Sequence, residues 1–310
     1  MIYSRKSIFL VFFLCFLIAI CVFLSLSRSP KNFEYTNNIY TYWEGDQNKI
    51  VDRCLQYMNY YSEGFNLIIL NKNNIDITDK LLFKVDRPEH RSDFIRLSYL
   101  EKYGGIWMDA SIIVLRPIYE WLSDMHTKYN IKKDDKDILI GFGCPFDTSI
   151  LENWLFYCSP HCSFVKLWKE EYLIAVKIGF EKYCKKNKYI LQDHFHSLST
   201  MVPYLTQHLC FCKVFLEKKY NTKIFMQPSC DGPFQYLCKN QMESAKGISY
   251  LNSIQKRNLK KQYFIKLRGS ERLFIDSYLK DAACKKNSIL YDLLEKQIPL
   301  KNPLKKDKNK

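Results

Sequence analysis

The chain has 310 residues, of which 47% are hydrophobic and 15% aromatic, and its 47 basic and 32 acidic side chains give a formal net charge of +15. This hydrophobic content excludes a disordered chain, and ten glycines and ten prolines are too few for a fibrous or linker-rich protein. No period of about 20–50 residues recurs, which argues against a solenoid or a propeller. The positive charge favours a partner that carries phosphate, whether nucleic acid, lipid head group or nucleotide.

An uncharged apolar segment occupies residues 8–26. A helix of this length covers about 30 Å, the thickness of the hydrocarbon core of a bilayer. The alternative is a cleaved signal peptide, but the run exceeds the usual apolar region of about 7–15 residues and no clean Ala-x-Ala site follows. We therefore predict a short N-terminal tail and an uncleaved signal-anchor helix within residues 1–27.

The orientation of this anchor is not fixed by charge, because basic residues flank it on both sides. The short head and the large C-terminal body favour a single-pass type II membrane protein, with the body in the Golgi or endoplasmic reticulum lumen if the cell is eukaryotic. A body that faces the cytosol is the alternative. Ten cysteines outside the anchor are consistent with disulfides in an oxidising lumen. The absence of an Asn-x-Ser/Thr sequon argues against a luminal body.

The sequence after the anchor divides into three predicted regions. Residues 28–38 form a polar stem, 39–295 one domain without a convincing internal linker, and 296–310 a basic tail that we expect to be disordered.

The domain opens with an alternation of strand and helix. Residues 39–43 are typical of a strand, apolar residues recur at helical spacing over 47–61, and 66–70 are typical of a short buried strand. This order predicts a βαβ unit of an α/β fold, with a parallel sheet covered by helices.

A second helix is expected over 93–103, with Ser92 as its N-cap and Gly104-Gly105 as its end. The remaining predicted elements are strands over 106–108, 112–115 and 138–142, and helices over 164–180 and 194–209, the last interrupted by Pro203.

Four polar residues between positions 93 and 111 indicate a ligand site. Asp93 and Arg96 are three residues apart on one helix face. Asp109 and Ser111 follow a strand and point the same way in extended geometry, at the sheet edge where open α/β folds bind ligands. Such oxygen ligands suit Mg²⁺ or Mn²⁺ bound to a diphosphate. The structural alternative is a surface ion pair between Asp93 and Arg96 and a turn capped by Asp109.

The pattern S-D-x-x-R-x-x-x-L-x-x-Y-G-G-I-W-x-D-A-S, over 92–111, resembles capsular polysaccharide synthesis proteins and the related DXD sugar transferases of the glycosyltransferase family 32 type. The resemblance covers about residues 39–175 well, including the segment 39–45, Cys54 and the Glu-Asn-Trp of 152–154, and the remainder weakly.

This resemblance implies a GT-A (Rossmann-like) fold and transfer of a hexose from a UDP- or GDP-sugar, with retention at the anomeric carbon, to a glycan, glycolipid or protein. Trp43 would stack on the nucleotide base, where stacking contributes about 1–3 kcal/mol. Asp93 and Arg96 would hold the donor sugar, and Asp109 would bind the ribose and the metal.

One position departs from a full DXD motif, since Ser111 replaces the second acid. The resemblance still implies Mn²⁺ or Mg²⁺ at Asp109 and Ser111, because capsular-synthesis relatives commonly carry Asp-Ala-Ser here. In the C-terminal half, the basic loop with Lys266 and Ser270 is a candidate for diphosphate contacts.

Four further side chains are candidates for the same site. His194 and His196 form a His-x-His pair, which chelates in a strand but not readily in a helix. Asn153, together with Glu152, is a candidate for facing the acceptor.

Two other functions compete with sugar transfer. Ser111 motivates a catalytically inactive relative that acts as a glycan-binding or assembly partner. The charge of +15 motivates binding to nucleic acid. We expect no nucleic-acid partner, because the sequence lacks a basic–aromatic module and an anchored body has little access to nucleic acid.

Overall fold

The structure is a computed structural model that describes residues 36–45, 49–76, 85, 87–193, 203–280, 284–296 and 298. The predicted anchor (8–26), most of the stem and the tail, and the pair His194 and His196 lie outside the described residues, so these remain predictions. Among the helices that the structure describes, none combines the length and the apolar character needed to cross a bilayer.

Within the described residues, six strands form the central sheet in the order β2-β1-β3-β6-β5-β7. Their bounds are Asn38–Tyr42 (β1), Asn66–Leu70 (β2), Gly105–Met108 (β3), Ile138–Gly143 (β5), Leu151–Cys158 (β6) and Lys223–Pro228 (β7). All neighbouring pairs are parallel except those made by β6, which runs antiparallel to β3 and β5. The predicted α/β class is confirmed, but a wholly parallel sheet is wrong, because the short connection 144–150 allows a hairpin and not a crossover.

The predicted βαβ unit is present at the start of the sheet. Helix α2 (Lys49–Tyr61) connects β1 to β2, which pair in parallel with Ile39 opposite Leu67. The helix buries Ile50, Cys54 and Met58, which are three or four residues apart on one face.

Helix α3 (Pro88–Tyr103) begins earlier than the sequence predicts. Pro88 stands in its first turn, where proline needs no backbone N–H partner, and Arg87 is the extended N-cap. The predicted Ser92 cap is therefore wrong, and Asp93 lies in the second turn of the helix. Gly104 and Gly105 end the helix with φ angles of 63° and 100°, which favour glycine.

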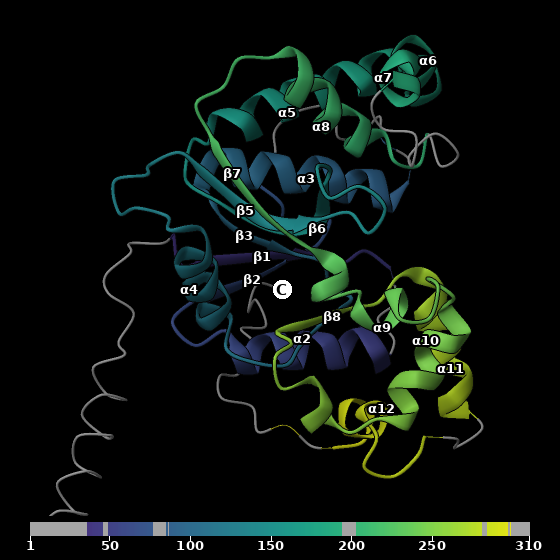
Figure 1. Cartoon of the computed structure of the whole chain (residues 1–310). Coiled ribbons are helices and arrows are strands. Elements are labelled where there is room, and N and C mark those ends of the chain that lie inside the picture. The colour runs from purple at the N-terminus through teal and green to yellow at the C-terminus, as the bar shows by residue number, and fades with distance from the viewer. Residues whose placement is uncertain are drawn as a thin grey trace, which may run out of the picture. The chain divides into compact units, whose positions relative to one another are not determined.

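Helices α3, α5 (Ser163–Ile178) and α8 (Thr206–Glu217) lie on one side of the sheet (Figure 1). The predicted single helix over 164–180 is two helices, because Gly179 with φ 89° separates α5 from α6 (Phe180–Lys186). Helix α7 (Lys188–Asp193) follows, and α8 starts only after Pro203.

The side of the sheet that bears α2 also carries a two-stranded antiparallel sheet of β4 (Ile112–Val114) and β8 (Phe264–Lys266) (Figure 1). Their register pairs Ile112 with Lys266. The sequence predicts β4 but not the other elements of this region. These are α4 (Ile118–Tyr129), η3 (Ser229–Asp231), α9 (Gln235–Cys238), α10 (Ser244–Ser253), η4 (Lys256–Leu259), α11 (Gly269–Lys280) and α12 (Ile289–Leu294).

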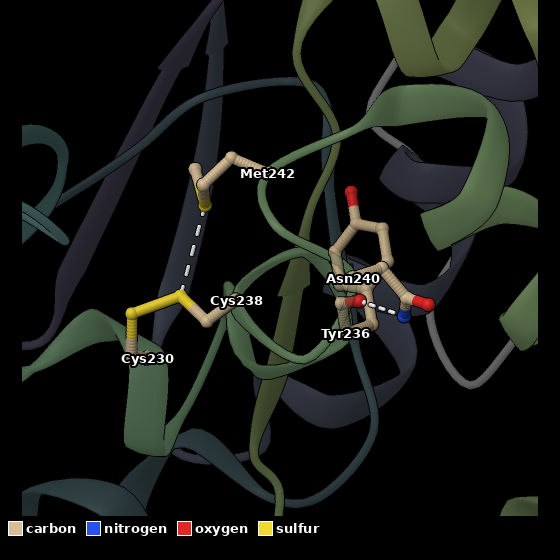
Figure 2. The surroundings of a disulfide bond; sticks show 5 residues. All are labelled: Cys230, Tyr236, Cys238, Asn240 and Met242. Carbon is tan, nitrogen blue, oxygen red and sulfur yellow. Dashed lines mark hydrogen bonds between the residues drawn. A yellow bond between two sulfur atoms is a disulfide. The ribbon is translucent and has the colours of Figure 1, made fainter.

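A disulfide between Cys230 and Cys238 closes the short segment from η3 to α9 (Figure 2). The Met242 sulfur lies 3.7 Å from Cys238 Sγ (Figure 2). The eight other cysteines in the described part of the chain are free thiols, and all but Cys284 are buried.

Candidate active site

Asp109 lies in the turn that joins β3 to β4. The backbone N–H of Ile112 donates to the Asp109 carbonyl oxygen at 3.1 Å, and the Asp109 N–H donates to Trp154 O at 2.9 Å. The predicted extended geometry at Asp109 and Ser111 is therefore wrong, because the chain turns there so that β4 can pair with β8 instead of prolonging β3. Both side chains nevertheless meet at one group, the ammonium of Lys266.

Both oxygens of the Asp109 carboxylate accept hydrogen bonds. Oδ1 accepts from Arg96 Nη2 at 3.0 Å and from Trp107 Nε1 at 2.9 Å, and Oδ2 accepts from Lys266 Nζ at 2.6 Å. Burial alone would raise the pKa of this carboxyl, but the charges of Lys266 and Arg96 outweigh it and lower the pKa to about 2. Asp109 is therefore an anion at any physiological pH.

Lys266 is buried, and its Nζ also donates to Ser111 Oγ at 2.9 Å. The antiparallel pairing of β4 with β8 places it beside these two residues. Burial lowers the pKa of Lys266, and the adjacent Asp109 carboxylate opposes that shift.

Asp93 and Arg96 form a second, connected part of the site. Arg96 Nη1 donates to Asp93 Oδ1 at 2.5 Å and also to Gln207 Oε1, while Asn153 Nδ2 donates to Asp93 Oδ1 at 3.2 Å and to Gln207 Oε1 at 2.6 Å. Gln207 Nε2 returns a hydrogen bond to the Asp93 backbone carbonyl at 2.9 Å. Because Arg96 also contacts Asp109, one hydrogen-bonded network within the described residues joins six predicted site residues, namely Asp93, Arg96, Asp109, Ser111, Asn153 and Lys266.

Gln207 is a member of this network that sequence reasoning missed. It lies on α8, and its own backbone carbonyl accepts from Trp168 Nε1 at 2.8 Å. No motif in the sequence surrounds Gln207, so its role follows only from the packing of α8 against α3 and α5.

The two carboxyls of the site have opposite pKa shifts. Burial raises the pKa of Asp93 to about 6, with partial opposition from Arg96 and His208. Asp109 is shifted down because two cations contact it directly. Carboxyls whose pKa values are pushed apart in this way are typical of functional sites.

Trp43 follows the carboxyl end of β1, next to Asp109 at the carboxyl end of the parallel neighbour β3. Its partly buried ring packs against Ala110, Val51 and Leu55. The guanidinium of Arg272, on α11, lies 5.8 Å from the centre of that ring, within the distance of a cation–π contact. Trp43 thus packs against a cluster that includes Ala110, the residue that follows Asp109.

The predicted basic loop after Lys266 is only partly in the site. Arg268 forms an ion pair with the buried Glu271 at 2.8 Å, and Ser270 Oγ bonds Ser244 and Glu271 instead of any group near Asp109. In this arrangement α11 begins at Gly269 and turns these side chains toward α10, so a diphosphate contact by Ser270 stays a prediction. Glu152 is also engaged elsewhere, with its carboxylate 3.8 Å from His208 Nε2.

The predicted metal ligands do not fit a divalent cation in this arrangement. Lys266 Nζ lies within hydrogen-bond distance of both Asp109 Oδ2 and Ser111 Oγ, and Asp109 Oδ1 already accepts two hydrogen bonds. Among the residues that the structure describes, no three His, Cys, Asp or Glu side chains gather as a metal-binding group. A hard cation such as Mg²⁺ or Mn²⁺ would have to displace a bound ammonium to reach either ligand.

A family model described as "Capsular polysaccharide synthesis protein" matches residues 23–281. The chain belongs to this capsular polysaccharide synthesis family. The resemblance predicted from the motif over 92–111 is thereby confirmed, and the match extends well beyond the segment 39–175 on which that resemblance rests. No curated protein matches the chain.

Several solved glycosyltransferases are also similar to the chain. A glycosyltransferase involved in the glycosylation of the major capsid of PBCV-1 is 12% identical, with a TM-score of 0.40 over 78% of this chain and 98% of that one. The PaToxG glycosyltransferase is 13% identical, with a TM-score of 0.33 over 66% and 88%. The glycosyltransferase GlyE of Streptococcus pneumoniae TIGR4 is 7% identical, with a TM-score of 0.37 over 81% and 66%. These TM-scores are low, so we base the function on the family and on the geometry of the site.

Proposed function

We propose that this capsular polysaccharide synthesis protein is a glycosyltransferase that moves a hexose from a nucleotide-sugar donor, with UDP or GDP as the nucleotide, to a glycan, glycolipid or protein. The observation that carries this proposal is the network that joins Asp93, Arg96 and Asp109 at the carboxyl end of β3. Ligands of open α/β sheets bind at this edge.

The donor would lie across the ends of β1 and β3. Trp43 would stack on the base, and the cations Lys266 and Arg272 would face the diphosphate, whose negative charge grows as the bond to the sugar breaks. We assign Asp93 Oδ2 to a hydroxyl of the donor sugar, because Arg96 and Asn153 hold the other oxygen of that carboxylate in place. The mixed α/β sheet supports the GT-A type of fold. We keep retention at the anomeric carbon as part of the proposal, to be read from the configuration of the product by NMR.

The activity is tested by release of nucleoside diphosphate from a panel of UDP- and GDP-sugars, with the purified full chain and a mixture of glycan acceptors. We expect release with one donor and its loss in Asp109→Ala, because the carboxylate that anchors Arg96, Trp107 and Lys266 is removed. The control Glu243→Gln changes an exposed carboxylate that pairs only with Lys246 among the described residues, and it should leave release unchanged.

Thermal unfolding of both variants separates loss of function from loss of fold. Full release in a folded Asp109→Ala protein would contradict the proposal. A wild type that neither binds a donor in calorimetry nor releases nucleoside diphosphate would favour the alternative, a catalytically inactive relative that binds glycans or assists assembly.

The membrane location is a separate part of the proposal and is supported by the sequence alone. We propose that residues 8–26 anchor the protein as a type II single-pass membrane protein with the catalytic domain in the lumen. Resistance to carbonate extraction and protection of the body from added protease in sealed membranes are expected. Digestion of the body in sealed membranes would instead place it in the cytosol.

A further inference from the structure

Lys266 lies where the sequence predicts a metal ion. Its Nζ is 2.6 Å from Asp109 Oδ2 and 2.9 Å from Ser111 Oγ, so one ammonium contacts both predicted metal ligands. The side chain of Lys266 is only 8% exposed, and its Nζ lies 5.9 Å from the centre of the Trp154 ring. Because Lys266 is this buried, its ammonium is fixed in position by the groups it contacts, whereas the ammonium of a surface lysine moves freely in solvent.

The backbone of Lys266 is fixed on both sides by the disulfide-closed segment. Its N–H donates to Pro233 O at 3.1 Å, and its carbonyl oxygen accepts from Tyr236 Oη at 2.8 Å. Both partners lie between Cys230 and Cys238, in the segment that this disulfide closes (Figure 2). The pairing of β8 with β4 adds a further constraint, so Lys266 is built into the site by two independent features.

With Lys266 in this position, two carboxylates of the site are paired with two cations. The carboxylates of Asp93 and Asp109 face the cations of Arg96 and Lys266, and all four groups are connected by ion pairs or hydrogen bonds. A divalent cation at Asp109 would add two positive charges beside a buried ammonium, where repulsion is poorly screened. Because the Lys266 ammonium already contacts both predicted metal ligands, the arrangement disfavours a divalent cation at Asp109.

We propose that Lys266 supplies the positive charge that a divalent cation supplies in metal-dependent transferases, so that this protein binds its nucleotide diphosphate without a metal. This inference rests on the proposed function. Lys266, together with Arg272 beside Trp43, would hold the diphosphate oxygens and neutralise the charge of the leaving group. A lysine suits this role because its ammonium acts as a point charge toward phosphate.

The experiment is calorimetric titration of the full chain with UDP and GDP, in EDTA and in Mn²⁺. We expect the Kd of the better nucleotide to agree within about twofold between the two conditions, and Lys266→Met to weaken binding about tenfold or more. Lys266→Arg should recover part of the affinity because it keeps the charge. The control Lys246→Met, at an exposed lysine paired with Glu243, should bind like the wild type.

Manganese binding gives a readout that does not depend on nucleotide or activity. Electron paramagnetic resonance of free Mn²⁺ should detect no site in the wild type, and a new weak site in a folded Lys266→Met protein, in which Asp109 Oδ2 and Ser111 Oγ lose their hydrogen bond from Lys266. Nucleotide binding that needs Mn²⁺ in the wild type would overturn this inference and leave the proposed transferase intact. No nucleotide binding in either condition would overturn both.

Discussion

At the scale of single residues, Asp93 and Asp109 illustrate how position determines the role of the same side chain. Asp109 contacts two cations and stays ionised, whereas Asp93 shares Arg96 with it and is more affected by burial. The sequence predicts both residues from one motif but not this difference. Gln207, which holds Arg96 and Asn153 in place, lies more than a hundred positions from Asp93 and belongs to no recognisable motif.

The pKa of Asp93 makes the stability of the protein depend on pH. In the folded state this pKa is raised to about 6 from the ordinary value of 3.8, so between these values the folded state binds more protons than the unfolded state. The free energy of unfolding should therefore gain a contribution from this group as pH falls from about 7 toward 4. Asp109 acts in the opposite sense. Because its pKa is lowered in the folded state, ionised Asp109 stabilises the fold, and this contribution to the free energy of unfolding is lost as pH falls below about 4.

Denaturant unfolding of the wild type and of Asp93→Asn at several pH values isolates the contribution of Asp93. We expect the difference in unfolding free energy between the two proteins to change in the wild type's favour as pH falls from about 7 to about 5. A difference that is constant over this range would contradict the raised pKa. In the same range donor turnover should fall, because protonated Asp93 no longer offers a carboxylate to the sugar.

At the scale of elements, the Gly104-Gly105 junction places Asp109 relative to α3. A Cβ on Gly105 would lie 2.5 Å from the Asn38 carbonyl oxygen, at a φ of 100°, so both the backbone conformation and the contact with β1 require glycine. The sequence identifies this junction as the end of a helix. It does not show that the same residue allows β3 to begin beside β1.

Gly105→Ala should therefore destabilise the protein by more than the backbone conformation alone costs. Gly64→Ala is the matched control, because Gly64 has a φ of 83° but open space where a Cβ would stand. We expect a loss of about 1–2 kcal/mol for Gly64→Ala and a clearly larger loss for Gly105→Ala, measured by chemical denaturation. Equal losses in the two variants would show that the close approach to Asn38 does not matter.

The elements predicted correctly are those with local signals. The βαβ unit over 39–70 has clear periodicity and turns, and the glycine pair ends α3 as expected. The N-terminus of α3 was mispredicted because Ser92 competes with Pro88 as a start signal. The sequence does not predict β6, because Glu152 and Asn153 interrupt its start and the short apolar run that follows has no alternation to distinguish it from a buried helix.

At the scale of the whole molecule, the site in the described residues combines side chains that one motif predicts with side chains from the C-terminal half of the chain that hold them in place. Lys266 reaches Asp109 across 157 positions of sequence, through the pairing of β8 with β4 and the disulfide-closed segment. Contacts of this range leave no local pattern. For that reason the sequence predicts Asp109 and the family, but it assigns Lys266 only to a basic loop.

The central claim is that Trp43, Asp93 and Asp109 serve one nucleotide-sugar site, and donor binding by three alanine variants tests it most directly. Calorimetry with the donor found in the panel should show a loss of about 1–3 kcal/mol of binding free energy for Trp43→Ala, as expected for stacking on a base. Asp93→Ala and Asp109→Ala should each bind the same donor about tenfold more weakly or worse. Wild-type affinity in a folded Trp43→Ala or Asp93→Ala protein, alongside lost binding in Asp109→Ala, would place these residues in separate sites and contradict the account.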